Sequence, residues 1–216
     1  MKASIYSLIF VYTIFNMSAQ TPIIGIYGTE YYGGVAGAYY RDIGGFHNQY
    51  VGTWVYTNGN TTFKITFVKK NSFHVTNDVR DYYADFLIGE FQYIDNGVEK
   101  VNTLSYINQS HSNIFDYNVV SVVPYDKSIY PLCPECSENE LRLLMRFNEP
   151  SRRNIWGGIS NKFVIRRFVE NGQEKLKVQF VYTGNGLESL NTMDGPPANI
   201  NSFSVPYGEY ILTKQP

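Results

Sequence analysis

Apolar and polar side chains alternate with a period of two along most of the chain after residue 50, which is the pattern of strands that bury one face. In the run from Lys175 to Tyr182, for example, Lys, Lys and Gln alternate with Leu, Val and Phe. We find no segment that combines a helical period with capping residues. The alternation predicts strands over residues 50–56, 63–67, 83–94, 98–107, 141–147, 163–165, 176–182 and 207–214.

Short turn signals separate several of these runs. Asn58-Gly59, Asn96-Gly97 and Asn171-Gly172 each predict a tight hairpin, because Asn and Gly both tolerate positive φ. Strands that follow one another through hairpins form an antiparallel meander, and a meander of about eight strands usually closes. The predicted fold class is therefore all-β, an antiparallel up-and-down meander that closes into a barrel.

The alternation also assigns the two faces of the strands. Basic side chains must stay hydrated, so they mark the outer face: Lys64, Arg142, Arg146, Lys175 and Lys177. The apolar rows opposite them, one of which begins at Leu141, then point inward. The candidate lining of a ligand site inside the barrel is Phe63, Ile65, Phe67, Leu143, Met145, Val178 and Phe180. These side chains are bulky, so they either fill the barrel or leave a modest cavity for a small apolar ligand.

The organisation of the chain has three parts. Residues 1–19 place Lys2, an apolar run and then small polar residues in the order of a secretory signal peptide. Residues 20–45 are rich in Gly and Tyr and predict an irregular arm that packs by its tyrosines or stays mobile. Residues 46–216 make up the barrel domain, interrupted by irregular stretches at 111–124, 126–140 and 184–206.

Composition and charge exclude several classes of partner. The chain has 18 basic and 19 acidic residues, and this balance lacks the concentrated basic face that binds nucleic acid. After the leader, no stretch is long and apolar enough to span a bilayer. The 19 Tyr and 14 Phe favour strands, and the tyrosines suit either an exterior sheet surface or a binding face.

Cys133-Pro134-Glu135-Cys136 is the one short motif that suggests chemistry. In an exported protein a disulfide between Cys133 and Cys136 is the leading interpretation. Free thiols, a redox pair and a metal site are the alternatives.

The other chemistry-bearing residues form no catalytic pattern. His47, His74 and His111 are scattered, so we predict no metal site and no cofactor. Asp85 and Glu90 lie five residues apart on one strand and therefore on opposite faces, which excludes a glycosidase pair made by these two alone. We predict that the protein is not an enzyme.

Two sets of residues carry a resemblance to known families. Gly52-Thr53-Trp54, preceded by Phe46, resembles the Gly-x-Trp start of lipocalins and fatty-acid-binding proteins. In those barrels the Trp closes one end under a basic residue of the last strand, so the resemblance implies structural roles for Gly52, Trp54 and Lys214.

The second resemblance covers the chain from Tyr39 to its C-terminus. Tyr40-Arg41-Asp42-Ile43, Val51-Gly52-Thr53-Trp54, Phe147-Asn148-Glu149-Pro150 and Ile211-Leu212-Thr213-Lys214-Gln215 together resemble a family of uncharacterised, exported, lipocalin-like (calycin-type) proteins of Gram-negative bacteria. It implies a lipocalin-like barrel and export, and it brings no catalytic residues.

We therefore expect an exported, non-enzymatic binding protein, periplasmic or extracellular, whose barrel holds a small apolar or amphipathic ligand. The alternative is a protein- or glycan-interaction module of the cell envelope that acts through its Tyr-rich arm and loops. An apolar cavity inside the barrel favours the first function, and an exposed aromatic row favours the second. A polar pocket with clustered Asp, His or Arg favours an enzyme.

Overall fold

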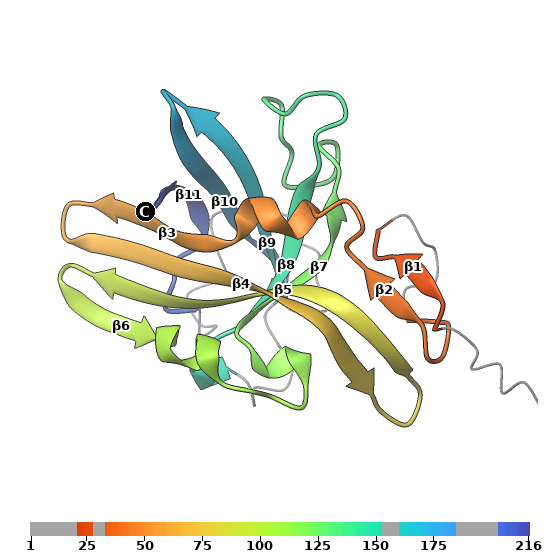
Figure 1. Cartoon of the computed structure of the whole chain (residues 1–216). Helices are drawn as coiled ribbons and strands as arrows, with labels where there is room; N and C mark the ends of the chain where they lie inside the picture. Colours follow the sequence, from red (N-terminus) through yellow and green to blue (C-terminus); the bar gives the residue numbers. More distant parts are fainter. Residues whose placement is uncertain (1–20, 28–32, 153–159, 185–202) are drawn as a thin grey trace, which may run out of the picture.

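The computed structural model describes residues 21–27, 33–152, 160–184 and 203–216. Within these residues eight antiparallel strands close into a barrel (Figure 1). They pair in chain order, β3-β4-β5-β7-β8-β9-β10-β11, and β11 returns to pair with β3, so the barrel is the predicted up-and-down meander. The predicted leader and most of the stretch 184–206 lie outside the described residues.

The barrel strands are β3 (Gly52–Asn58), β4 (Thr61–Thr76), β5 (Asp81–Asp95), β7 (Val119–Tyr125), β8 (Arg142–Phe147), β9 (Ser160–Glu170), β10 (Gln173–Gly184) and β11 (Gly208–Lys214). The remaining elements are β1 (Ile23–Gly25), β2 (Tyr39–Arg41), β6 (Val98–Asn102) and the short 3₁₀ helices η1 (Phe46–Tyr50), η2 (Leu104–Asn108), η3 (Ile114–Asp116) and η4 (Pro150–Arg152). None of the helices in the described ranges is long and apolar enough to cross a membrane.

The barrel differs from the prediction in one strand. The strand predicted over 98–107 ends at Asn102, pairs with β5 alone and lies outside the barrel. Its place is taken by β7, in a stretch that the sequence predicts to be irregular. The sequence of β7 is Val-Val-Ser-Val-Val-Pro-Tyr, a nearly continuous apolar run, so a search for alternation does not find it.

Aromatic side chains pack against one another inside the barrel. The ring of Phe147 lies 4.7 Å from that of Phe91 and 4.8 Å from those of Phe163 and Phe180, measured between centroids. All seven residues predicted to line a ligand site are buried members of this same core cluster. Gly89 completes the packing, because a Cβ atom there would lie 2.8 Å from the ring of Phe67.

Two side chains at the start of β8 differ from the predicted exposure. Leu141 is exposed, because β8 begins one residue later. Arg142 points outward as predicted, yet it is fully buried, which contradicts the expectation that it stays hydrated. The loop that carries the Cys133–Cys136 disulfide covers it, and four acceptors replace water: the carbonyl oxygens of Asp126, Ile129 and Pro131 and the side-chain oxygen of Gln179.

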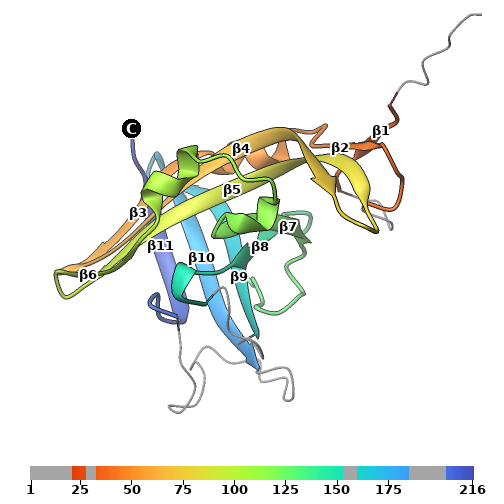
Figure 2. The ribbon, with the colours of Figure 1, turned by 90° about the horizontal axis from the view of Figure 1, so that it is seen from below.

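Strands β4 and β5 extend beyond the barrel (Figure 2). β3 follows β4 only as far as Phe67, and β7 pairs with β5 only at Ile88 and Gly89. The N-terminal arm binds to this extension: β2 pairs in parallel with β5, and β1 pairs in parallel with β2. The Gly-rich sequence of the arm does not predict these two short strands.

A second apolar cluster covers one face of the extension, outside the barrel. It joins side chains of β5 to the arm and to the segment around η3, and its buried members are Ile26, Ala38, Tyr40, Tyr82, Ala84, Phe86, Ile88, Ile114, Tyr117 and Val120. The opposite face of the extension carries polar side chains, among them Tyr39, Lys69 and Asp85.

Candidate binding site

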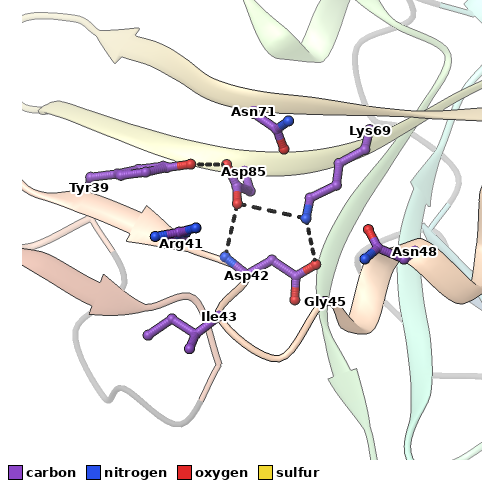
Figure 3. Close-up of a pocket in the computed structure, with 9 residues that line it drawn as sticks. All are labelled: Tyr39, Arg41, Asp42, Ile43, Gly45, Asn48, Lys69, Asn71 and Asp85. Atoms are coloured by element: carbon purple, nitrogen blue, oxygen red, sulfur yellow. Dashed lines mark hydrogen bonds and ion pairs between the residues drawn. The ribbon is translucent and has the colours of Figure 1, made fainter.

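A pocket of about 480 Å³ opens where the arm meets the extension of β4 and β5 (Figure 3). We call it the arm pocket. It is lined by Tyr39, Arg41, Asp42, Ile43, Gly45, Asn48, Lys69, Asn71 and Asp85. These residues come from β2, the turn that follows it, η1, β4 and β5, so the arm supplies about half of the lining.

Strand alternation explains why these side chains meet. Tyr39 and Arg41 lie on the face of β2 opposite Tyr40, which is buried in the second apolar cluster. Lys69 continues the inward row of β4, and Asp85 continues the inward row of β5. Both rows therefore change from apolar to charged side chains where the strands leave the barrel.

The carboxylate of Asp85 joins the arm to the barrel strands. It accepts hydrogen bonds from the Tyr39 hydroxyl at 2.5 Å, the Asp42 backbone N–H at 3.0 Å and the Ser72 backbone N–H at 2.9 Å. Ser72 has a φ of 51° and lies in a register shift of β4, and this irregularity turns its N–H toward the carboxylate. Burial, reinforced by the hydrogen bond to Asp85, raises the pKa of Tyr39 to about 12.

Asp42 holds the turn between β2 and η1. Its carboxylate accepts the backbone N–H groups of Phe46 and His47 at 2.8 and 3.0 Å, and the Lys69 ammonium lies 3.0 Å away. Burial acts to raise the pKa of this carboxyl, but the hydrogen bonds from Lys69 and from the backbone of His47 outweigh it, so the pKa is lowered. Asp42 therefore stays ionised beside Lys69.

His47 fixes the other end of the arm. Its Nε2 atom is hydrogen-bonded to the hydroxyl of Tyr27, and its Nδ1 atom lies 3.8 Å from the carboxylate of Asp42. The ring is fully buried, and burial lowers its pKa to about 4. The neutral ring of His47 and the carboxylates of Asp42 and Asp85 thus form three polar contacts that hold the arm in place.

The accessible groups of the arm pocket differ from these buried ones. Asp42 and Asp85 expose only 1 % and 3 % of their side chains, and three donors already occupy each carboxylate. Arg41, Asn48 and Asn71 are exposed, and their side chains have no hydrogen-bond partner among the residues that the structure describes. Ile43 adds an apolar surface, with 68 % of it exposed. A ligand in this pocket therefore meets a guanidinium, the partly exposed ammonium of Lys69, two amides and one apolar side chain.

The residues predicted from the sequence to form a site lie elsewhere. The seven candidate lining residues are buried in the core cluster inside the barrel. Trp54 is fully buried, and the Nζ atom of Lys214 lies 5.4 Å from the centroid of its ring. A Cβ atom on Gly52 would lie 3.2 Å from Cε of Lys214, so these three residues form one contact between the first and last strands. Cys133 and Cys136 form the predicted disulfide.

Asp85 and Glu90 occupy separate environments, as their opposite faces predict. Glu90 is fully buried outside the barrel and accepts the backbone and side-chain N–H groups of Asn118. Within the described ranges no group of three or more His, Cys, Asp or Glu residues is arranged to hold a metal ion.

Sequence reasoning missed the arm pocket, although two signals point to it. Asp85 and Lys69 are charged residues in phase with apolar rows, on the face that is otherwise buried. Tyr40-Arg41-Asp42-Ile43, one of the motifs that carry the family resemblance, supplies three of the lining residues. Neither signal shows that the arm pairs with β5, because the Gly-rich sequence of the arm does not predict a strand there.

The profile of a family described as "Family of unknown function (DUF6705)" matches residues 1–215. The chain belongs to this family. A comparison with curated proteins finds no match, and a comparison with solved structures finds none. The description of DUF6705 assigns the family no activity.

Proposed function

We propose that this protein is an exported, non-enzymatic binding module of the cell envelope, and that it binds its partner in the arm pocket rather than inside the barrel. One contrast carries the proposal. The seven side chains that would line a barrel ligand are buried in contact with one another, whereas the arm pocket is open and presents polar groups that no described residue engages. A pocket of about 480 Å³ is within the usual size range of small-molecule sites, about 300–1,000 Å³.

The packing of the barrel supports the arm pocket over the carrier function. Phe147 contacts the rings of Phe91, Phe163 and Phe180, and Met145 is 2 % exposed in the same cluster. Protein interiors are close-packed, so a ligand would have to displace several of these side chains at once. The arm pocket requires no such rearrangement.

The arm pocket contains the Asp and Arg residues that would favour an enzyme, so catalysis must be weighed as well. A general base has to reach the substrate within hydrogen-bond distance. The carboxylates of Asp42 and Asp85 each accept three donors, and the ring of His47 is fully buried against Tyr27. These groups hold the arm in place and are not available as a general acid or base, which supports a non-enzymatic binding function.

Sedimentation with insoluble envelope material from the native host tests this function. We expect the mature protein to sediment with the envelope fraction in a saturable way. Asn71→Trp places a large side chain in the arm pocket and should abolish this retention. Asn108→Trp is the matched control, since Asn108 is exposed on η2 and should tolerate the same change without loss.

The carrier function makes the opposite prediction. An environment-sensitive fatty-acid probe would then bind saturably, Met145→Trp would abolish the binding, and Asn71→Trp would leave it unchanged. Retention on envelope material that survives Asn71→Trp would also contradict the proposed site. Protease treatment of the envelope fraction then distinguishes a protein partner from a glycan.

A further inference from the structure

Hydrogen-bond donors outnumber acceptors among the accessible groups of the arm pocket. Both carboxylates are buried and already occupied by three donors each. The groups that remain are the guanidinium of Arg41, the partly exposed ammonium of Lys69 and the amides of Asn48 and Asn71. Arginine and lysine only donate, and each amide adds two further donors to one acceptor oxygen. A matching ligand must therefore be rich in acceptor oxygens.

The formal charges of the lining sum to zero, since Lys69 and Arg41 match the carboxylates of Asp42 and Asp85, but of these two cations only Lys69 lies within ion-pair distance of a carboxylate among the described residues. Lys69 lies 3.0 Å from Asp42 and 3.9 Å from Asp85, so its charge is balanced within the wall. Arg41 lies on the pocket face of β2 and forms no ion pair with any described residue. Its planar fork of N–H donors matches a carboxylate in a bidentate geometry, which a lysine ammonium cannot reproduce.

The size of the pocket and the placement of its amides extend the match beyond a simple anion. At about 480 Å³ the pocket is much larger than one carboxylate group. Asn48 on η1 and Asn71 on β4 approach it from different elements (Figure 3). Each amide both donates and accepts, and a hydroxyl group does the same, so the two suit each other. The exposed side chain of Ile43 offers an apolar surface for the carbon face of a sugar ring.

We propose that the arm pocket binds a saccharide that carries a carboxylate, a uronate, with Arg41 recognising the carboxylate and Asn48 and Asn71 the hydroxyls. This inference rests on the proposed function and specifies its ligand class.

Calorimetric titration of the mature protein with a set of small saccharides tests the inference. The set contains oligomers of galacturonate and of glucuronate, the neutral oligomers of galactose and glucose, and acetate. We expect saturable binding of at least one uronate oligomer, with the neutral oligomers and acetate at least tenfold weaker. Arg41→Gln should lower the uronate affinity at least tenfold, whereas Lys100→Gln, an exposed charge removed on β6, should leave it within twofold.

Two results would overturn this ligand class. One is equal affinity for neutral and acidic oligomers, or uronate binding that Arg41→Gln leaves unchanged. The other is that no oligomer binds. If Asn71→Trp still abolishes retention on envelope material in that case, the arm pocket stands as a binding site and only the uronate is wrong. If retention is unaffected, the proposed function fails as well.

Discussion

The Nζ atom of Lys214 lies 5.4 Å from the centroid of the Trp54 ring, and this contact joins the last strand of the barrel to the first. The two residues are paired in a ladder between β11 and β3 that includes only one other pair, Thr213 with Val55. Trp54 is fully buried, and its Nε1 atom donates to the carbonyl oxygen of Tyr50 at 2.8 Å. The short ladder makes side-chain packing important for closing the barrel.

Trp54→Ala should therefore destabilise the protein by about 3–5 kcal/mol, the usual cost of removing a buried aromatic side chain. Lys214→Ala should cost much less, about 0.5–1 kcal/mol, because its ammonium is partly exposed. Urea denaturation measures both. A Trp54→Ala protein as stable as the parent would contradict the packing role. So would free quenching of Trp54 fluorescence by iodide, measured in a Trp156→Phe background.

Met145→Trp should destabilise the protein by about 1–3 kcal/mol, because the larger ring has no space among the packed aromatic side chains of the barrel. Val123→Trp, at an exposed position on β7, is the control and should change stability little. Thermal and urea denaturation give the comparison. If Met145→Trp were neutral or stabilising, the barrel would contain the empty volume that the carrier function needs.

The loop over β8 should depend at least as much on Arg142 as on its disulfide. Arg142→Met leaves three backbone carbonyls and the Gln179 oxygen without their donor, and we expect a cost of about 1.5–3 kcal/mol. Replacing both Cys133 and Cys136 by Ser should cost no more than about 2 kcal/mol, since so short a loop gains little from closure. Hydrogen exchange should rise across 126–140 in the Arg142 variant. Unchanged exchange there would contradict this role.

Stability should fall as the pH falls from 6.5 toward 4, because of His47. Its pKa is lowered from 6.5 to about 4 in the folded protein, so between these values the unfolded chain binds the additional proton. The contribution of neutral His47 to the free energy of unfolding is fully present above pH 6.5 and is lost as the pH falls through about 4. The pKa difference between the folded and unfolded states corresponds to roughly 3 kcal/mol of this free energy.

A series of urea denaturations from pH 4 to pH 7.5 measures this dependence. His47→Asn should flatten it. Equal pH dependence in the parent and in His47→Asn would show that another group is responsible.

The barrel was predictable because alternation and turn chemistry act locally. Asn96 and Asn171 have φ values of 50° and 51°, and the glycines that follow them are also positive, as the predicted hairpins require. β7 was not predicted because both of its faces are partly covered, so its sequence does not alternate between apolar and polar residues. The burial of Arg142 was not predicted for a different reason. Carbonyl oxygens of the loop over 126–131 accept the hydrogen bonds that water would otherwise accept from its guanidinium.

The arm pocket was not predictable from local patterns, because it arises where two distant segments meet. Tyr39 and Asp85 are 46 residues apart, and nothing in either flanking sequence encodes their hydrogen bond. The sequence does show that Lys69 and Asp85 are charged residues at positions that continue otherwise apolar rows. Charged residues in phase with a buried face therefore indicated where the barrel ends and a polar site begins.

The most direct test of the central claim is a map of backbone amide chemical shifts during titration of the ¹⁵N-labelled mature protein with soluble envelope polysaccharide from the native host. We predict that the shifts concentrate at residues 39–48, 69–72 and 85, around the arm pocket. Shifts centred instead on Met145, Phe163 and Phe180, inside the barrel, would contradict the account.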